Sequence, residues 1–327
     1  MTVSRSADTD STPTLAQVAA HAGVSPITVS RVVRLPDMVA PATRQRVETA
    51  MRTLGYVPNL VAGSLASART RTVGVLVPTV ANAIFADTIQ GISDALEPLG
   101  YAVFLAQSRY DDAREEKMLA ALLGRRPEAL IMVGSPATVA GSQMLRRAHI
   151  PVVETWDLPV DPIDAVAGFD NYAAGAAVAG HFASSGRRRL AFIGGDDPRA
   201  TRRWSGFHQA AQEAGLEPPR RLVLARNAEA GVAAGAELAE HDAAFVANDA
   251  LAIGVLAGLR QSGRRVPEDI ALVGLGDLQI GRLMTPSLST VRIDGEAIGQ
   301  TAGRLTAFQE GPRRIDLGFT LLTRHTG

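Results

Sequence analysis

The sequence predicts a small all-α helix-turn-helix headpiece followed by an α/β core of two lobes, each a doubly wound parallel sheet. The chain has 327 residues, which is too long for one ordinary domain. From Thr14 to Tyr56 the apolar residues recur at helical spacing, and no run alternates as a strand would. From Val73 onward, short apolar runs alternate with longer amphipathic stretches, the pattern of βαβ units around buried parallel sheets.

The headpiece pattern divides into three helices. Thr14 can cap the first, and Gly23 ends it. Ser25 can cap the second, with Pro26 in its first turn, where a missing N–H is harmless. The third begins after Ala40, which has no side-chain oxygen for capping. Two short helices joined by a glycine-containing turn are the helix-turn-helix signature.

The core pattern predicts strands and helices in alternation. We expect strands at residues 73–77, 102–106, 129–133, 152–154, 190–193, 222–225, 244–247, 270–275 and 288–293. We expect helices that include residues 85–99, 115–123, 173–185, 203–214 and 250–262.

The composition favours a soluble protein of the cytoplasm. Apolar residues make up 46% of the chain and charged residues 20%, without an apolar run long enough for a membrane span. Residues 1–13 are polar, lack the apolar core of a secretory signal and are expected to form a disordered tail. The absence of cysteine excludes a disulfide framework, an iron–sulfur cluster and a cysteine nucleophile.

The net charge of zero conceals an uneven distribution. Residues 1–71 hold eight arginines against four acidic residues, a balance of +4, so the remaining 25 basic and 29 acidic residues give −4. Because basic segments attract DNA phosphates, a neutral total does not argue against a nucleic-acid partner.

Two consecutive segments carry a resemblance to a known family. Residues 14–33 read TLAQVAAHAGVSPITVSRVV, and TRQRVETAMRTLGYVPNLVAGSLAS follows. This order resembles the DNA-binding headpiece and hinge of the lactose/galactose repressor family. The resemblance implies a DNA-binding domain at 14–58, a hinge helix and linker at 59–71, and an effector-binding and dimerisation domain at 72–327. It also implies a first lobe of about 72–168 with 294–314, and a second of about 169–293 with 315–327.

The second helix is the expected recognition helix. Its N-terminal residues Pro26 and Ile27 can make apolar contacts with bases, and Arg31, one turn later, can bind a guanine with two hydrogen bonds. Hydroxyl and amide groups suited to phosphates are found at Thr14, Ser25, Thr28, Ser30 and Asn59. Capping is the alternative role of these serines and threonines. The resemblance further implies that Ala62 and Leu65 lie in the hinge, with Leu65 inserted into the DNA minor groove.

The effector site is expected between the lobes, at the carboxyl ends of the strands. By resemblance, its candidate residues are Thr79, Asn82, Ile84, Phe85, Glu154, Asp157, Arg203, Asn248 and Asp277. The family usually has a sugar-binding aspartate where this chain has Gly276.

The missing aspartate and the two neighbouring arginines suggest the class of ligand. Without that aspartate, but with Arg203 and its neighbour Arg202, the site suits an anion, since a guanidinium pairs well with a carboxylate. Orientation of Arg202 toward solvent is the alternative. The segments AVAGFDNYAAG and LGDLQIGRLMTPSLSTV and the ending DLGFTLL look like the gluconate-utilisation repressor branch.

We therefore expect a homodimeric transcriptional repressor that gluconate or a related sugar acid releases from operator DNA. A neutral sugar, a phosphorylated ligand or co-repression remain alternatives within the family. A sugar-binding receptor without a DNA role and an enzyme are alternatives from other classes. The sequence has no GxxxxGK[ST], HExxH or GxSxG motif, and its GGDDPR segment lacks GxGxxG spacing. We expect no enzymatic activity, cofactor, metal or membrane partner, and no heptad tail for a tetramer.

Overall fold

The computed structural model describes residues 12–58, 70–308 and 312–327. The chain divides into two compact units at Thr70 and Arg71. The expected disordered tail lies almost wholly outside the described residues, and so do the hinge candidates Asn59, Ala62 and Leu65.

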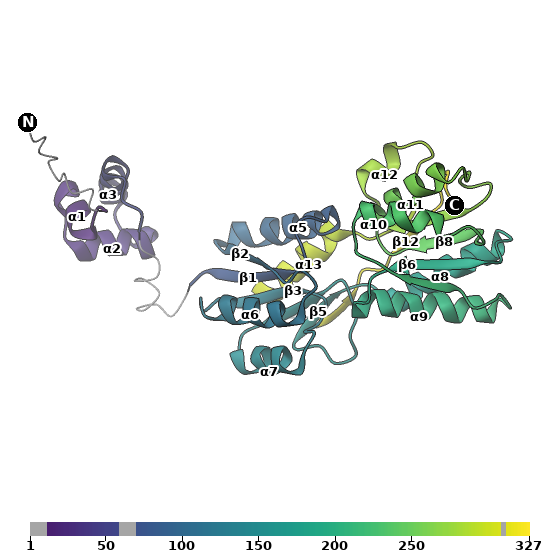
Figure 1. The fold of residues 1–327 in the computed structure, drawn as a ribbon. Coiled ribbons are helices and arrows are strands. Elements are labelled where there is room, and N and C mark those ends of the chain that lie inside the picture. Colours follow the sequence, from purple (N-terminus) through teal and green to yellow (C-terminus); the bar gives the residue numbers. More distant parts are fainter. Residues whose placement is uncertain (1–11, 59–69, 309–311) are drawn as a thin grey trace, which may run out of the picture. The chain divides into compact units, whose positions relative to one another are not determined.

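The N-terminal unit is a three-helix headpiece (Figure 1). Its elements are α1 (Leu15–Ala22), α2 (Pro26–Arg34), the short 3-10 helix η1 (Pro36–Met38) and α3 (Pro41–Leu54). The predicted caps are confirmed. Thr14 caps α1 in a capping box with Gln17, Gly23 ends α1 at φ 64°, and Ser25 Oγ accepts from Thr28 N at 3.2 Å. Ala40 provides no side-chain cap, as expected.

Lobe 1 is a six-stranded parallel sheet in the order β11-β5-β4-β3-β1-β2. Its strands are β1 (Thr72–Val77), β2 (Ala102–Gln107), β3 (Ala129–Val133), β4 (Val152–Thr155), β5 (Ala165–Gly168) and β11 (Arg314–Asp316). Its helices are η2 (Ala83–Phe85), α5 (Ala86–Leu96), η3 (Glu97–Leu99), α6 (Asp112–Leu123), α7 (Val139–Ala148) and α13 (Gly295–Ala307). The helices α5 and α13 pack together, and α6 packs beside α7.

Lobe 2 is a six-stranded sheet in the order β12-β10-β9-β8-β6-β7, with only β12 antiparallel. Its strands are β6 (Leu190–Gly194), β7 (Arg220–Val223), β8 (Ala243–Val246), β9 (Ala271–Leu275), β10 (Ser289–Arg292) and β12 (Thr320–Leu322). Its helices are α8 (Asn171–Ser184), α9 (Pro198–Glu213), α10 (Ala228–Ala236), α11 (Asp249–Gln261) and α12 (Gln279–Leu283).

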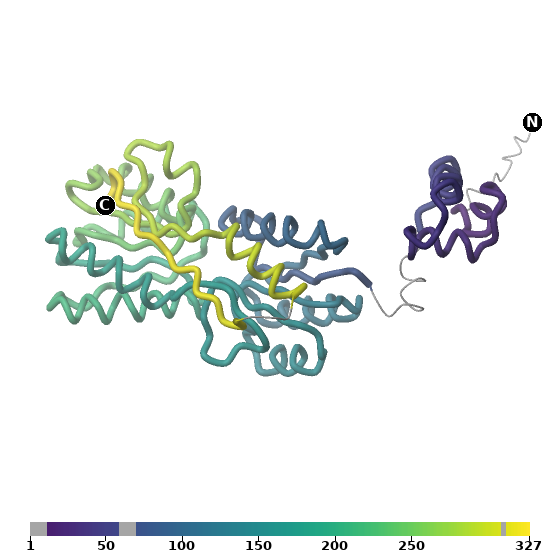
Figure 2. The backbone as a smooth tube through the Cα atoms, turned by 180° about the vertical axis from the view of Figure 1, so that it is seen from behind, coloured from purple at the N-terminus to yellow at the C-terminus, as the bar shows by residue number. Residues whose placement is uncertain are grey.

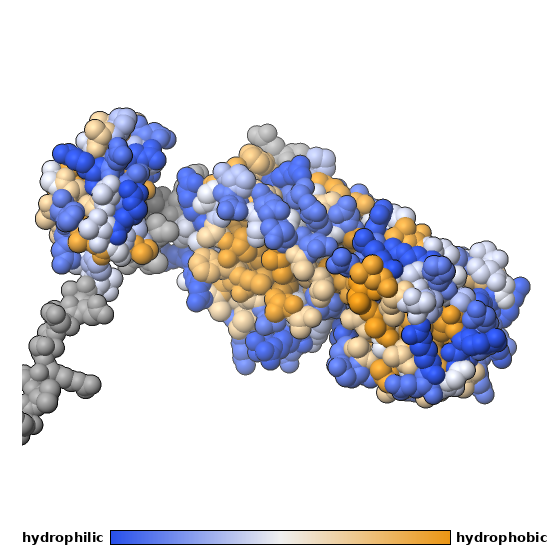
Figure 3. Space-filling view, turned by 90° about the horizontal axis from the view of Figure 1, so that it is seen from above, coloured by the Kyte–Doolittle hydropathy of each residue, from blue (hydrophilic) through white to orange (hydrophobic). Residues whose placement is uncertain are grey.

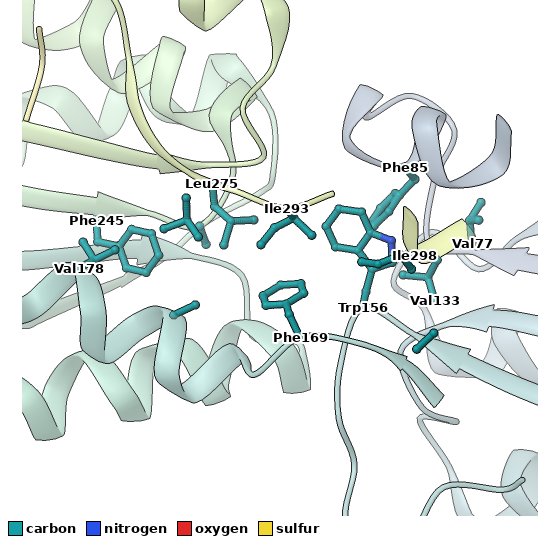
Figure 4. Packing of buried hydrophobic residues seen from close by; sticks show 14 of the residues in the cluster. Val77, Phe85, Val133, Trp156, Phe169, Val178, Phe245, Leu275, Ile293 and Ile298 are labelled. Carbon is teal, nitrogen blue, oxygen red and sulfur yellow. The ribbon is translucent and has the colours of Figure 1, made fainter. Parts of the chain in front are cut away.

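Three chain crossings join the lobes, between β5 and α8, β10 and α13, and β11 and β12 (Figure 2). One apolar cluster runs through the junction, where Phe169 and Ile293 lie between the lobes and Trp156 lies beside Phe85 (Figure 4). Because both lobes contribute side chains to this cluster, a change in their relative position would alter the packing at the crossings.

Several elements differ from the expected ones. No strand was expected at β5, whose AVAG run is short and rich in small residues. The single helix expected at 85–99 is preceded by the 3-10 turn η2, and α5 ends at Leu96. Pro98 then interrupts the helical hydrogen bonding, and the second 3-10 turn η3 follows. The strand expected at 222–225 lies at Arg220–Val223, and the first sheet extends to Asp316, beyond the expected boundary at 314.

Candidate functional site

One exposed face of α2 presents the expected base-reading residues. Ile27 is 71% exposed and Arg31 is also exposed, whereas Val29 and Val32 are buried against the other helices. Residues four apart share a helix face, so Ile27 and Arg31 are neighbours on that surface. The Arg31 guanidinium makes no hydrogen bond or ion pair within the described residues of the headpiece. Its planar fork is therefore available to another molecule.

The hydroxyl groups expected at phosphates already have partners inside the headpiece. Ser25 Oγ and Thr28 Oγ1 are 2.9 Å apart, and Thr14 Oγ1 lies 3.0 Å from the side-chain oxygen of Gln17. Ser30 Oγ accepts a hydrogen bond from Arg34. Since hydroxyls can accept and donate at once, capping and phosphate contact are compatible roles.

A cavity lies between the lobes at the carboxyl ends of their strands. Its free volume is about 30 Å³, which is room for roughly two waters. Five of the nine candidate effector residues line it, namely Asn82, Ile84, Phe85, Arg203 and Asn248. The remaining lining residues were not expected from the sequence: Tyr110, Trp156, Gly195, Asp197, Arg199, Ala200, Arg226, Ala247 and Leu275.

The cavity is strongly cationic. The lining holds three arginines, Arg199, Arg203 and Arg226, against a single carboxylate, that of Asp197. Arg199 and Arg226 form ion pairs with Asp197 at 3.6 and 2.7 Å, and Arg203 acts on it through its charge. Burial opposes ionisation of this carboxylate, but the three guanidinium groups hold the pKa of Asp197 well below its usual range. Burial lowers the pKa of Arg203 to about 10, so this side chain is still charged at neutral pH. The lining therefore carries a surplus of positive charge.

Two of the three arginines lie over aromatic rings of the opposite lobe. The Arg226 guanidinium lies 3.9 Å from the centre of the Tyr110 ring, and the Arg199 guanidinium lies 5.7 Å from the centre of the Phe85 ring. Arg226 also pairs with Asp197 at 2.7 Å. A side chain at Gly195 would meet the Arg226 guanidinium, so this glycine leaves room for the arginine.

Four candidate effector residues do not line the cavity. Thr79 Oγ1 accepts from the backbone N of Ala81 at 3.1 Å. Glu154 is buried and accepts from Ile163 N at 2.9 Å. Asp157 is also buried, at the crossing between the lobes, and bonds Asn171 and Arg202.

The fourth, Asp277, is held away from the cavity by two cations of lobe 2. Its carboxylate pairs with Arg324 at 2.6 Å and with Arg282 at 2.9 Å. At the preceding residue, a β-carbon on Gly276 would approach Ile84 Cδ1 to 3.1 Å, and its φ of 131° disfavours any side chain. A side chain at this position is thus disfavoured by the backbone conformation and crowded by Ile84.

Arg202 does not join the cationic lining. Its Nη1 pairs with Asp157 Oδ1 at 3.2 Å and also contacts the carbonyl of Leu158. It therefore points neither into the cavity nor freely into solvent. The anion-binding potential of the site rests on Arg199, Arg203 and Arg226.

The buried acid Asp249, which follows the cavity residue Asn248, gives a pH-dependent prediction. Burial raises the pKa of Asp249 from 3.8 to about 6, although its carboxylate accepts from Thr290 Oγ1 at 2.7 Å and Leu278 N at 2.8 Å. Asp277 raises this pKa further, and Arg324 lowers it. The protonated form is thus favoured by folding, so the stability from this group is present below about pH 4 and is lost as pH rises through about 6.

We expect Asp249→Asn to remove this dependence. The free energy of unfolding of the unchanged protein, measured by urea titration, should fall relative to the variant by up to roughly 3 kcal/mol between these pH values. A constant difference between the two proteins across that range would contradict the assignment.

Comparison with known proteins identifies the family. Residues 14–59 match the bacterial regulatory proteins of the lacI family, and residues 179–314 match a periplasmic binding protein-like domain. The HTH-type transcriptional regulator GntR of Pseudomonas aeruginosa is 38% identical over 328 residues, covering 96% of this chain and 95% of that protein. The chain belongs to the LacI family. Members of this family are DNA-binding transcriptional regulators and not enzymes.

Solved LacI-family structures have the same fold. A LacI-family regulator from Silicibacter pomeroyi matches with a TM-score of 0.88 and 32% identity, covering 96% of this chain and 99% of that one. The lac repressor dimer bound to operator and the anti-inducer ONPF matches with a TM-score of 0.83 and 26% identity, covering 97% and 99%. The helical headpiece and the two parallel-sheet lobes of this LacI-family chain are therefore as predicted. No described helix is long and apolar enough to cross a membrane.

The unexpected lining residues of this LacI-family protein follow strand ends. Gly195, Asp197 and Arg199 come directly after β6, within the GGDDPR segment, and Arg226 follows β7. Tyr110 follows β2. Their position after a strand was visible in the sequence, but which of the many strand ends meet at one cavity was not.

Proposed function

We propose that this LacI-family protein is a repressor that a small sugar acid, gluconate or a close relative, releases from operator DNA. The observation that carries the proposal is that Arg199, Arg203 and Arg226 line one interlobe cavity in which Asp197 is the only lining carboxylate. A carboxylate ligand would form charge-assisted, forked hydrogen bonds with these guanidinium groups. The relatives named GntR agree with the sugar-acid class.

One atom of the cavity lacks the partner that a ligand would supply. Arg203 is 8% exposed, and its Nε makes no hydrogen bond within the described chain. Buried polar groups of this kind are rarely left unpaired. Asn248 Oδ1 caps α11 by accepting from Leu251 N at 2.8 Å, which leaves its amide N–H groups for ligand hydroxyls.

The small size of the cavity connects ligand binding to lobe movement. The free volume of about 30 Å³ is too small for a six-carbon acid, and we propose that the lobes change position to admit it. A ligand that prefers one lobe arrangement shifts the protein toward it, and the DNA affinity changes if the arrangements bind DNA unequally. This linkage is the proposed basis of release in the cytoplasm.

We expect Arg203→Lys to weaken gluconate binding by about tenfold to hundredfold, because lysine keeps the charge but loses the planar fork. Isothermal titration calorimetry with gluconate measures the change. DNA affinity without gluconate should be unchanged. Arg188→Lys, at an exposed position outside the cavity, is the matched control and should bind as the unchanged protein does. Equal affinities in all three proteins would refute the role of Arg203.

For DNA recognition, we propose that Ile27 and Arg31 of α2 read bases, and that Pro26 adds an apolar contact. Thr14, Ser25, Thr28, Ser30 and Asn59 are proposed to bind phosphates. From the sequence resemblance alone, Ala62 and Leu65 are proposed to form the hinge, with Leu65 as the minor-groove wedge.

We propose that the protein pairs as a homodimer through exposed apolar side chains on both lobes. Phe104 and Leu105 on β2 are each 44% exposed, while Ile280 and Leu283 on α12 are 57% and 73% exposed. Figure 3 shows hydrophobic surface on each lobe. A relative has been solved as a dimer. Burying such residues in a second copy would remove apolar surface from water.

We expect Leu283→Glu to shift the protein from dimer toward monomer in sedimentation experiments, because it places a charge in the proposed interface. Val160→Glu is the matched control, since this apolar side chain is 97% exposed on a loop of lobe 1. Dissociation by the control, or none by Leu283→Glu, would contradict this interface.

One titration decides between release and co-repression. A fluorescent duplex selected by the protein from a random library is bound, and gluconate is then added. A fall in anisotropy on adding gluconate supports release from DNA, and a rise in anisotropy means co-repression. If gluconate has no effect but a neutral or phosphorylated sugar does, the proposed ligand class is wrong.

A further inference from the structure

A chain of buried hydrogen bonds connects the lobe junction to Arg203. Asp157, Asn171 and Arg203 are 4%, 1% and 8% exposed, respectively. Asp157 belongs to lobe 1, just beyond β4, whereas Asn171 begins α8 and Arg203 lies on α9, both in lobe 2. Polar groups buried to this extent have strongly preferred geometries, because every lost partner leaves an uncompensated group.

Asn171 is bonded in both directions. Its Nδ2 donates to Asp157 Oδ1 at 3.0 Å and to the backbone O of Trp156 at 2.9 Å, while its Oδ1 accepts from Arg203 Nη1. The amide thus donates both of its hydrogens to lobe 1 atoms and accepts a hydrogen bond from the cavity arginine. No other side-chain type offers two donors and an acceptor in this short planar shape.

The lobe 1 end of this chain is held by several contacts of Trp156. Trp156 has a φ of 67°, a conformation in which a bulky residue is rarely found unless its surroundings hold it there. Its indole Nε1 donates to Thr88 Oγ1 at 3.0 Å, and its ring packs edge-on against Phe85. Arg202, on α9 of lobe 2, pairs with the same Asp157 oxygen at 3.2 Å and is a second connection between the lobes.

The lobe 2 end is held by close contact between α8 and α9. A β-carbon on Gly175 would lie 1.9 Å from the backbone O of Arg203. The backbones of the two helices are therefore in direct contact at the arginine. This contact fixes the backbone of Arg203 relative to α8, and the hydrogen bond from its Nη1 to Asn171 Oδ1 directs its guanidinium.

We infer that Asn171 is a positioning residue that makes the direction of the Arg203 guanidinium depend on the arrangement of the lobes. The lobe 1 atoms at Trp156 and Asp157 orient the Asn171 amide, and this amide orients Arg203 toward the cavity. A change of lobe position would break these bonds and turn the ligand-binding arginine. This inference rests on the proposed function only in taking Arg203 as a ligand contact.

The first experiment needs no ligand. The chain contains two tryptophans, so in a Trp204→Phe background Trp156 alone reports on the junction. Trp156 is 3% exposed. We expect Asn171→Ala to increase quenching of its fluorescence by acrylamide, because the amide no longer ties lobe 2 to Trp156. Asn171→Asp, similar in size but without donors, should do the same and serves if the alanine variant does not fold.

The matched control is Asp170→Asn. Asp170 caps the same helix by accepting from Tyr172 N and Ala173 N but does not bond Arg203, and asparagine caps equally well. Its quenching should remain that of the parent. If Asn171→Ala and Asn171→Asp also quench as the parent does, the lobe connection is refuted.

The second experiment uses gluconate as the probe in a double-mutant cycle. We expect Asn171→Ala to weaken binding by about tenfold, as for loss of a hydrogen bond to a charged group. In the Arg203→Lys background, Asn171→Ala should weaken binding little further, because both changes disrupt the same contact between Arg203 and the ligand. Fully additive effects, or no effect of Asn171→Ala alone, would overturn the inference. If the parent itself does not bind gluconate, the proposed ligand fails, while the quenching result still decides the lobe connection.

Discussion

Replacing Arg31 by alanine is expected to weaken operator binding by about tenfold to hundredfold, the value of a forked arginine–guanine contact of about 1–3 kcal/mol. Discrimination between operator and unrelated DNA should fall with it, since base contacts carry the sequence information. The headpiece should remain folded, because Arg31 is exposed and has no partner within its described residues. Fluorescence anisotropy on both duplexes at fixed salt measures these changes.

Arg46→Ala provides the matched control for this experiment. Arg46 is exposed on α3, outside the proposed recognition helix. Any effect of this change should be small and equal for operator and unrelated DNA, as for a general loss of charge. A loss that is equally sequence-independent for Arg31→Ala would show that Arg31 does not read a base.

The largest expected loss of stability comes from one methyl group at Gly175. A β-carbon there would lie 1.9 Å from the Arg203 backbone O and 2.9 Å from Phe207 N. Backbone atoms cannot turn aside as a side-chain end can, so α8 and α9 must separate. We expect Gly175→Ala to lower the free energy of unfolding by about 3 kcal/mol, measured by urea titration.

Gly180 offers a control on the same helix. A β-carbon at Gly180 meets nothing within 4 Å. Since alanine is the better helix former, Gly180→Ala should leave stability unchanged or raise it by up to about 1 kcal/mol. If both changes destabilise the protein equally, the proposal that Gly175 is needed for the close contact between α8 and α9 is wrong.

Local signals in the sequence were sufficient for the headpiece. The caps at Thr14 and Ser25 and the helix end at Gly23 each depend on residues within a few positions, and the structure contains them as predicted. The alternation of buried strands with helices likewise predicted the two sheets. Short elements such as β5 were missed, because four small residues give no clear period.

The candidate cavity was predictable only in part. Asn82, Phe85 and Arg203 were expected from family motifs and line it, whereas Asp277 was expected and instead pairs with Arg282 and Arg324. Nothing near Asp277 in the sequence reveals Arg324, which reaches it from beyond β12. An ion pair between segments so far apart exists only once the chain has folded.

The sequence by itself determined the class of protein, its helical headpiece, the basic charge of its N-terminal segment and the lobes that follow. The tertiary structure decided which charges face one another. It brought Arg199 and Arg226 beside Arg203, turned Arg202 toward Asp157, and placed Asn171 between the lobes. The physical reason is that caps and periodicity act over a few residues, whereas a binding cavity is made by strand ends that only the folded sheets bring together.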